Sequence, residues 1–266
     1  MNAQLSLQGR HALVTGGGRG IGAAIARRLL SHGASVTLMG RDAATLAATA
    51  DTLAEAVVSP AILCTVTADI SQADSVAAAF AEAAGRAGPI DLLINNAGQA
   101  RSAPFGKTDL ALWQSMLAVN LTGTFVCTQA ALPHMLANGW GRIVNVASTA
   151  GLVGYGYVSA YCAAKHGVIG LTRALALETA SSGVTVNAVC PGYTETDIVR
   201  DAVANIVRKT GRTEAQARAE LAKGNPQGRL VQPDEVADAV AWLCQPSASA
   251  ITGQSIAVAG GEVMAG

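Results

Sequence analysis

Two residues that stand four apart, Tyr161 and Lys165, could together perform proton transfer. They lie in an Ala-rich stretch typical of a helix, so their side chains should project from one face. A free phenol, with a pKa near ~10, is a poor acid–base catalyst at neutral pH, but a neighbouring ammonium favours the phenolate and lowers that pKa. The spacing predicts that Tyr161 is a general acid–base assisted by Lys165. A tyrosine beside a surface lysine is also a common accident, so the prediction depends on the surrounding motifs.

Further polar residues follow apolar stretches that are typical of strands. Ser148 comes directly after Arg142–Ala147, and Asn95 begins the segment Asn95–Gly98. Doubly wound sheets bind ligands at the carboxyl ends of their strands, so both positions are candidates for a site. Asn120 lies in a helical stretch, where it is either a site residue or a residue that caps or kinks its helix.

The segment Thr15–Gly22 contains five glycines and lies between the first predicted strand and the first predicted helix. Glycine permits a tight turn and lets a pyrophosphate approach the backbone. The helix N-terminus then offers free N–H groups and the positive end of its dipole to the anion. The segment predicts a dinucleotide site, although glycine-rich turns occur in proteins of many functions.

The end of the second predicted strand bears on the choice of dinucleotide. An acidic residue there would hydrogen-bond the adenosine ribose and repel a 2′-phosphate, but the sequence has Gly40 and Arg41. The guanidinium of Arg41, joined by that of Arg19 from the glycine turn, suits a phosphate. NADP(H) is therefore the expected cofactor. If Arg41 only caps the strand, pairs with Asp42 or faces water, NAD(H) remains possible.

Alternating strands and helices must position these residues. Short β-branched runs predict strands at 11–15, 35–39, 62–67, 91–95, 142–147, 184–189 and 255–258. Longer Ala-rich stretches predict helices at about 21–32, 42–57, 72–87, 109–137, 158–181 and 233–244. The alternation predicts one α/β domain over residues 1–266, a doubly wound, mostly parallel, seven-stranded Rossmann-type sheet with helices on both faces. A charged helical insert at about 193–226 is expected to be a substrate lid, or else a solvated hairpin.

The composition excludes several classes of protein. Eighteen basic residues balance 18 acidic ones, so there is no positive surplus for nucleic acid, and 50% hydrophobic residues exclude a disordered chain. No apolar run approaches the ~18 residues of a membrane span. Five scattered cysteines fit neither a zinc site nor a disulfide scaffold, and the four histidines show no metal-ligand spacing, so no metal is expected. A reducing cytoplasm is the expected compartment.

The order of these motifs resembles the short-chain dehydrogenase/reductase family over about residues 8–261. The resemblance implies that Tyr161 protonates a carbonyl oxygen as hydride arrives from the nicotinamide, while Lys165 holds the nicotinamide ribose and lowers the Tyr161 pKa. Ser148 would hydrogen-bond the carbonyl oxygen and Asn120 would position a water that relays protons. The cofactor positions implied in addition to Tyr161 and Lys165 are Gly16, Gly18, Arg19, Gly20, Ile21, Gly22, Arg41, Asp69, Ile70, Asn96, Ala97, Gly98, Pro191, Gly192, Thr194 and Thr196. The substrate positions are Ser148, Ala150, Tyr155, Tyr161 and Tyr193.

The small, apolar residues after Ser148 favour an apolar ketone or a 3-ketoacyl thioester as substrate. Carrier-protein substrates rank lower, because Pro133 and Leu177 stand where carrier-protein reductases usually have docking arginines. Alternatives are an NAD(H)-dependent 3-hydroxyacyl-CoA or cyclic alcohol dehydrogenase and, without enzymatic activity, a dinucleotide-binding sensor or scaffold. A dehydratase or epimerase is disfavoured, since no second substrate domain follows the sheet. The resemblance also implies a homotetramer, or a homodimer.

Overall fold

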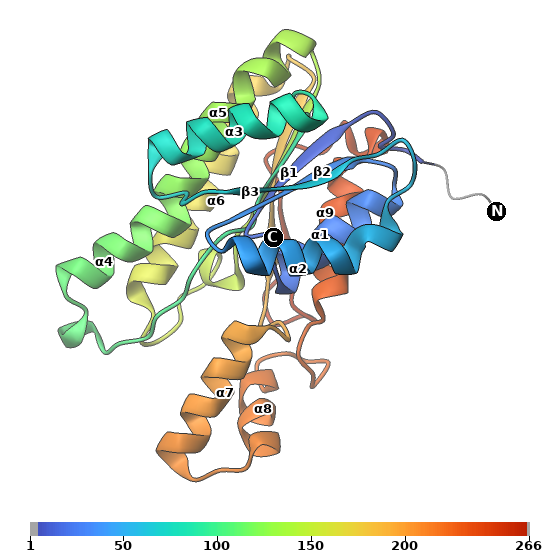
Figure 1. The fold of residues 1–266 in the computed structure, drawn as a ribbon. Coiled ribbons are helices and arrows are strands. Elements are labelled where there is room, and N and C mark those ends of the chain that lie inside the picture. The colour runs from blue at the N-terminus through green and yellow to red at the C-terminus, as the bar shows by residue number, and fades with distance from the viewer. Residues whose placement is uncertain (1–4, 265–266) are drawn as a thin grey trace.

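A seven-stranded sheet forms the centre of the protein (Figure 1). The computed structural model describes residues 5–264. The strands are β1 (His11–Thr15), β2 (Ser35–Gly40), β3 (Leu63–Thr67), β4 (Leu92–Asn95), β5 (Gly141–Val146), β6 (Val184–Pro191) and β7 (Ser255–Val258). Their order is β3-β2-β1-β4-β5-β6-β7, and each of these neighbouring pairs is parallel. The order reverses between β1 and β4, where doubly wound folds bind their ligands.

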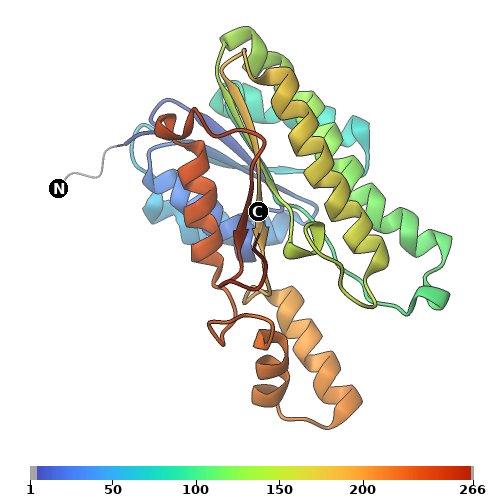
Figure 2. The same cartoon turned by 180° about the vertical axis from the view of Figure 1, so that it is seen from behind.

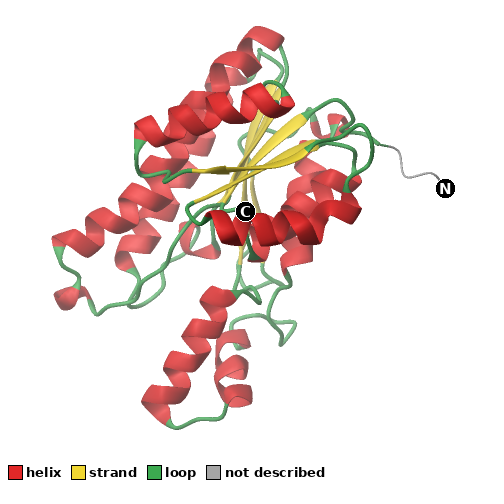
Figure 3. Cartoon of the chain, in the orientation of Figure 1, coloured by secondary structure: helices red, strands yellow, loops and turns green. Residues whose placement is uncertain are grey.

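Helices cover both faces of the sheet (Figures 2 and 3). One face carries α1 (Gly20–Ser31), α2 (Ala43–Leu53) and α9 (Pro233–Cys244). The other carries α3 (Ala73–Ala87), α5 (Gly123–Asn138) and α6 (Ser159–Thr179). The predicted doubly wound α/β fold is therefore confirmed.

Strand β1 shows why these short runs form a sheet buried on both faces. Ala12 and Val14 pack in the core beneath α1 and α9, whereas Leu13 packs in the core beneath α3 and α5. Successive side chains of a strand point to opposite faces, so a strand covered on both faces needs apolar residues at consecutive positions, as at 12–14. Each fully buried side chain of this size contributes about 1.5–3 kcal/mol. The fully buried β1 thereby anchors the glycine turn that follows it.

The helical stretch expected at about 109–137 is present at Leu110–Asn138, but a π-helical turn lies within it. The structure has α4 (Leu110–Leu117), a π-helical turn (Ala118–Thr122) and then α5. Within the turn, Nδ2 of Asn120 donates to the carbonyl oxygens of Met116, at 3.0 Å, and Gln99, at 2.9 Å. A side chain that bonds nearby backbone groups competes with regular helical bonding, and single π turns often mark functional sites. The turn thus carries Asn120 inward, where it is fully buried.

Leu110–Asn138, taken as one helical stretch, is long and apolar enough to cross a membrane, since 18 of its consecutive residues have a mean hydropathy of 1.3. The expectation that no stretch reaches this length was therefore wrong. Length and composition alone are weak grounds for a span, because a core helix passes the same test. Here α5 packs against β4 and β5, and α4 packs against α6.

The insert after β6 forms a helical hairpin that projects away from the sheet (Figure 1). Its helices are α7 (Asp197–Thr210) and α8 (Glu214–Ala222). They share a small apolar core that contains Val199, Val203 and Ala217. A parallel bridge between Thr194 and Val231 ties the two ends of the insert together. The insert is therefore held at its base, beside the carboxyl end of β6.

Candidate active site

The glycine turn between β1 and α1 is too tight for side chains. Gly16 and Gly20 have φ of 63° and 54°, values that L-residues with side chains rarely adopt. A Cβ on Gly22 would lie 2.2 Å from the carbonyl oxygen of Gly16, and one on Gly16 would lie 2.9 Å from Cα of Ala97. Gly18 packs on α2 instead, since its Cβ would lie 3.1 Å from Cγ2 of Thr45. The turn thus presents bare backbone at the N-terminus of α1, which fits a pyrophosphate.

Asn96 and Thr15 hold this turn against the end of β4. Nδ2 of Asn96 donates to the carbonyl oxygens of Thr15, at 3.0 Å, and Gly16, at 3.1 Å. Oγ1 of Thr15 accepts from the N–H groups of Asn96 and Ala97. Asn96 and Ala97 are thereby placed beside the turn, and the side chain of Asn96 bonds to the backbone of the protein, while their contact with a cofactor stays a prediction. Thr15 is a positioning residue that the sequence prediction did not single out.

The two arginines expected at a 2′-phosphate lie in different surroundings. Arg41 is exposed after β2 and forms no ion pair with Asp42, whose carboxylate instead accepts from the N–H of Thr45 and caps α2. Arg19 is also exposed, and its Nη1 lies 3.6 Å from Oδ2 of Asp197 at the start of α7. Both guanidinium groups are free to turn toward a phosphate, because exposed ion pairs are weak.

Asp69 and Ile70 come after β3, at the same edge of the sheet as the glycine turn that follows β1. Oδ1 of Asp69 accepts from the N–H and Oγ of Ser71, and these bonds, with Arg41 adding a smaller effect, lower the pKa of the carboxyl. Ile70 is buried, and its Cδ1 would lie 2.7 Å from a Cβ on Gly123 in α5. The carboxylate of Asp69 is thus held in place after the end of β3. The predicted contact with adenine requires a carboxylate at this position.

Residues after β6 form the opposite end of the site. Pro191 ends the strand, and the N–H of Gly192 donates to the carbonyl of Val258 in β7. The buried Thr194 donates through Oγ1 to the carbonyl of Gly192. Thr196 reaches back to the glycine turn, since a Cβ on Gly20 would lie 3.3 Å from its Cγ2. Ile21, the residue after Gly20, is partly buried against the core beneath α1 and α9.

The predicted acid–base pair is assembled at the carboxyl end of β5. Nζ of the buried Lys165 donates a 2.8 Å hydrogen bond to the carbonyl of Val146 and lies 5.7 Å from the ring centroid of Tyr161. Ser148 follows β5, and its hydroxyl lies close enough to the Tyr161 phenol to lower the pKa of that phenol. Oγ of Ser148 also accepts from the N–H of Ala150, at 3.1 Å. Strand β5 and helix α6 together therefore hold all three side chains in one place.

Asn120 joins this group through the bend after β4. Its Oδ1 accepts from the N–H of Gln99 at 3.1 Å. A Cβ on Gly98 would lie 2.9 Å from this Oδ1 and 3.8 Å from Nζ of Lys165. Both side chains therefore converge over Gly98, where any larger residue would intrude. The structure brings Asn120 and Lys165 together as predicted, with Gln99 as a partner that the sequence did not reveal.

The pKa of Tyr161 moves against the expected direction. Burial raises it to about 12, while the neighbouring hydroxyl of Ser148 lowers it. Burial also lowers the pKa of Lys165 to about 8. An ion inside the protein loses hydration, so burial favours the neutral forms of both groups. The prediction that Lys165 lowers the phenol pKa is thus not met, since burial has the largest effect on the pKa and Ser148 is the residue that lowers it.

The substrate side contains a carboxylate that sequence reasoning missed. The hydroxyl of Tyr155 donates to Oε1 of Glu262 at 2.7 Å and lies 2.9 Å from Oγ1 of Thr149. The ring of Tyr193 meets that of Tyr155 edge-on, with centroids 6.5 Å apart. Ala150 thus contacts Ser148, Tyr155 contacts the neighbouring Thr149, and Tyr193 packs on Tyr155, while their role in binding substrate stays a prediction. Glu262 follows β7 by sequence, and no local motif marks it.

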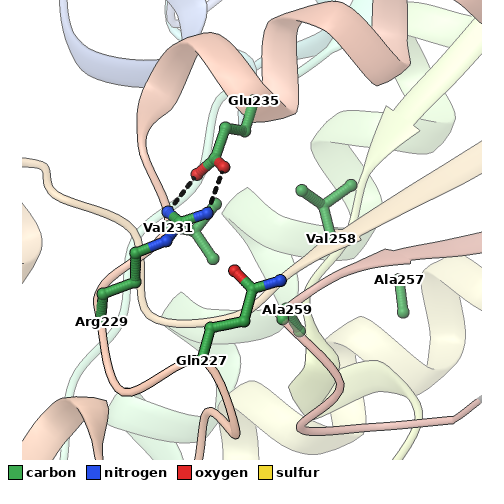
Figure 4. Close-up of a pocket in the computed structure, with 8 residues that line it drawn as sticks. Gln227, Arg229, Val231, Glu235, Ala257, Val258 and Ala259 are labelled. Atoms are coloured by element: carbon green, nitrogen blue, oxygen red, sulfur yellow. Dashed lines mark hydrogen bonds and ion pairs between the residues drawn. The ribbon is translucent and has the colours of Figure 1, made fainter.

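A separate pocket of about 190 Å³ lies outside this group of residues (Figure 4). Gln227, Arg229 and Glu235 line it together with residues 257–260 at the edge strand β7. In the wall of this pocket, Arg229 and Glu235 form a bidentate ion pair with hydrogen bonds of 2.5 and 2.7 Å. Within residues 5–264, no three His, Cys, Asp or Glu side chains gather closely enough to hold a metal ion.

Comparison with known proteins agrees with this arrangement. The family model described as short chain dehydrogenase matches residues 10–206. The cis-4-hydroxycyclohexanecarboxylate dehydrogenase of Sinomonas cyclohexanicum is 42% identical over 254 residues, which cover 95% of this chain and 96% of that protein. The D-beta-hydroxybutyrate dehydrogenase of Rhizobium meliloti (strain 1021) is 39% identical over 251 residues, or 94% of this chain and 97% of that one.

A solved structure extends the similarity to the whole fold. A variant of actinorhodin polyketide ketoreductase with NADPH superposes with a TM-score of 0.90 at 39% identity, and 98% of each chain is covered. Identity at this level over nearly the full length, together with the family match, settles the relationship. The chain belongs to the short chain dehydrogenase family and is an NAD(P)-dependent oxidoreductase that acts on CH–OH and C=O groups.

Proposed function

We propose that the protein reduces a ketone to a secondary alcohol with NADP(H), with Tyr161 as the general acid. The observation that carries the proposal is the group formed by Tyr161, Ser148 and Lys165 at the carboxyl end of β5. Its members come from one strand end and one helix, both rigid elements, so their mutual geometry is fixed before a substrate arrives. Asn120 completes the group over Gly98.

The proposed chemistry follows from the hydrogen-bonding capacity of these side chains. When bound, the reduced dinucleotide supplies the hydride. Ser148 donates a hydrogen bond to the carbonyl oxygen and stabilises the negative charge that develops there. Tyr161, whose phenol is protonated at neutral pH, gives its proton to that oxygen. Lys165, held by Val146, keeps an ammonium beside the phenol and favours the phenolate that remains.

The preference for NADP(H) rests on charge at the end of β2. Gly40 and Arg41 place a guanidinium, and no carboxylate, where a 2′-phosphate would bind, and Asp42 is committed to capping α2. The actinorhodin ketoreductase that was crystallised with NADPH supports the same choice. A bound phosphate would have to compete with Asp197 for Arg19. Phosphate–arginine pairs are stronger than exposed carboxylate pairs, so the competition favours the cofactor.

The substrate proposal is an apolar ketone or a 3-ketoacyl thioester, with the α7–α8 insert as a lid. The insert begins directly after Tyr193 and Thr194, so it is rooted beside the group around Tyr161. Cyclic ketones belong with this class, because the Sinomonas cyclohexanicum relative is named for a cyclic alcohol that carries a carboxylate. The lid itself packs around its own apolar core, which would let it move as a unit.

A substrate screen that follows NADPH absorbance tests the proposal. The panel should contain acyl-CoA thioesters, cyclic ketones and aromatic ketones, each offered with NADPH and with NADH. Turnover of at least one ketone with a higher kcat/KM for NADPH is expected. Tight NADPH binding without turnover of any ketone would instead favour a dinucleotide-binding sensor.

A further inference from the structure

Glu262 brings a carboxylate to the substrate side from the far end of the chain. The residue follows β7 after the turn at Gly260 and Gly261, whose φ values are 60° and 93°. A Cβ on Gly192 would lie 2.9 Å from Oε2 of Glu262, so the carboxylate packs directly on the backbone that follows β6. A Cβ on Gly224, at the end of the insert, would lie 3.0 Å from Oε1. Glu262 therefore occupies the junction between the insert and the site.

The carboxylate is half-buried, and no cationic side chain among the described residues pairs with it. Among the described residues, no nitrogen of lysine, arginine or histidine lies within 4.0 Å of its oxygens. Oε1 of Glu262 accepts a hydrogen bond from the hydroxyl of Tyr155. A carboxylate has about four acceptor sites, so Oε2 keeps the capacity to accept from a ligand. Burial, with smaller effects from Glu262, raises the pKa of both Tyr155 and Tyr193, so both phenols stay neutral donors.

A short series of neighbouring residues connects Ser148 and Tyr161 to Glu262. Ser148 lies close enough to Tyr161 to affect its pKa, Thr149 is the next residue, and Oγ1 of Thr149 lies 2.9 Å from the hydroxyl of Tyr155. A ketone whose carbonyl oxygen sits between Ser148 and Tyr161 would extend along this path toward the carboxylate. The far end of the substrate would thus meet a fixed negative charge.

We infer that Glu262 selects the substrate by charge, accepting a ketone whose far end carries a neutral hydrogen-bond donor and disfavouring one whose far end carries a carboxylate. The inference rests on the proposed ketone reduction and narrows its substrate class. Two like charges in a partly desolvated site repel each other, whereas a hydroxyl or amide can donate to Oε2. Specificity of this kind comes from repulsion of the wrong substrate as much as from attraction of the right one.

Two ring ketones of matched shape provide the test. 4-Oxocyclohexanecarboxamide and 4-oxocyclohexanecarboxylate differ in charge and in donor capacity at one end. Their binding is measured by calorimetric titration into protein saturated with oxidised NADP, at pH 7, where a ketone cannot be reduced. The wild type should bind the amide at least about tenfold more tightly, a difference of about 1.4 kcal/mol.

Glu262→Gln keeps the shape of the side chain and removes its charge. In this variant the dissociation constants of the two ketones should differ by no more than about threefold. The main cause is that 4-oxocyclohexanecarboxylate should bind the variant more tightly than it binds the wild type. Glu55→Gln is the matched control, because Glu55 is an exposed carboxylate in the turn after α2. That variant should keep the wild-type ratio. Glu262→Asp, which keeps the charge, should also keep the preference for the amide.

The wild-type titration alone can overturn the inference. Equal binding of the two ketones, tighter binding of the carboxylate, or no binding of the amide would each do so. An unchanged ratio in Glu262→Gln would show that another group sets the preference, which also overturns the assignment. The proposed ketone reduction fails separately, if NADPH is not consumed with any ketone of the screen.

Discussion

Nζ of Lys165 donates a 2.8 Å hydrogen bond to the carbonyl oxygen of Val146, the last residue of β5. One N–H of the ammonium is thereby attached to the central sheet, and the remaining donors stay available on the side of Tyr161 and Asn120. The helix supplies the spacing between Tyr161 and Lys165, but the strand sets where the ammonium lies. A change at the end of β5 should therefore disturb catalysis even without contact with the substrate.

Tyr161→Phe should lower kcat by about 10²–10⁴-fold, because the variant lacks the proton that the carbonyl oxygen needs. NADPH affinity, measured by fluorescence titration, should stay within about threefold of wild type, since the phenyl ring still fills the same space. Tyr157→Phe is the matched control, because Tyr157 is 71% exposed, and it should keep full activity. An active Tyr161→Phe enzyme would exclude the proposed mechanism.

The two directions of the reaction should depend on pH in opposite ways. Alcohol oxidation needs the phenolate of Tyr161, whose pKa is raised to about 12, so its kcat/KM should rise from pH 6 to about 8, below the pH at which Lys165 loses the charge that favours the phenolate. Ketone reduction uses the protonated phenol, which persists over this range. Reduction should instead decline above about pH 8, where Lys165 loses its charge. Steady-state profiles in both directions measure these trends, and Lys165→Met should lack the decline.

Arg41→Ala should lower kcat/KM for NADPH by about tenfold or more and leave that for NADH nearly unchanged, because only NADPH carries the 2′-phosphate. Arg27→Ala is a suitable control, since Arg27 is an exposed arginine that pairs with Asp234 on α9. The control should keep the wild-type ratio of the two cofactors. A wild-type enzyme that prefers NADH in steady-state assays would contradict the assignment.

The ion pair of Arg229 and Glu235 should make the stability sensitive to acid (Figure 4). The hydrogen bonds from Arg229, and next the one from the N–H of Gln232, lower the pKa of Glu235 to about 2. The folded pKa lies below the unfolded one, so this contribution is present above about pH 4.5 and is lost as the pH falls toward 2. The Tm difference between wild type and Glu235→Gln should narrow between pH 5 and 2. The pair is partly exposed, which keeps the effect modest.

The exposed apolar residues on α5 and α6 should be covered in a homotetramer. Leu177 is 82% exposed, and Phe125 and Leu136 are more than two-fifths exposed. Apolar side chains gathered on one surface favour association with another copy. Light scattering should give a tetrameric mass for the wild type and a smaller mass for Leu177→Arg. A monomeric wild type would refute this expectation.

Much of the catalytic group could be predicted from the sequence, because local spacing determines it. Four residues make about one helical turn, so Tyr161 and Lys165 share a face of α6 wherever that helix lies. The glycines of 15–22 likewise predict a turn without side chains, since the conformation depends on a few neighbouring residues. The alternation of strands and helices predicted the sheet for the same reason.

Only the tertiary structure decided which distant residues meet. Tyr155 and Glu262 are 107 residues apart and are joined because β5, β6 and β7 lie side by side in the sheet. The pairing of Arg19 with Asp197 depends in the same way on the position of the insert. The direction of the Tyr161 pKa shift was also decided by packing, since burial is a property of the whole fold. Sequence spacing specifies neighbours along the chain, whereas long-range contacts and desolvation arise only when the layers pack.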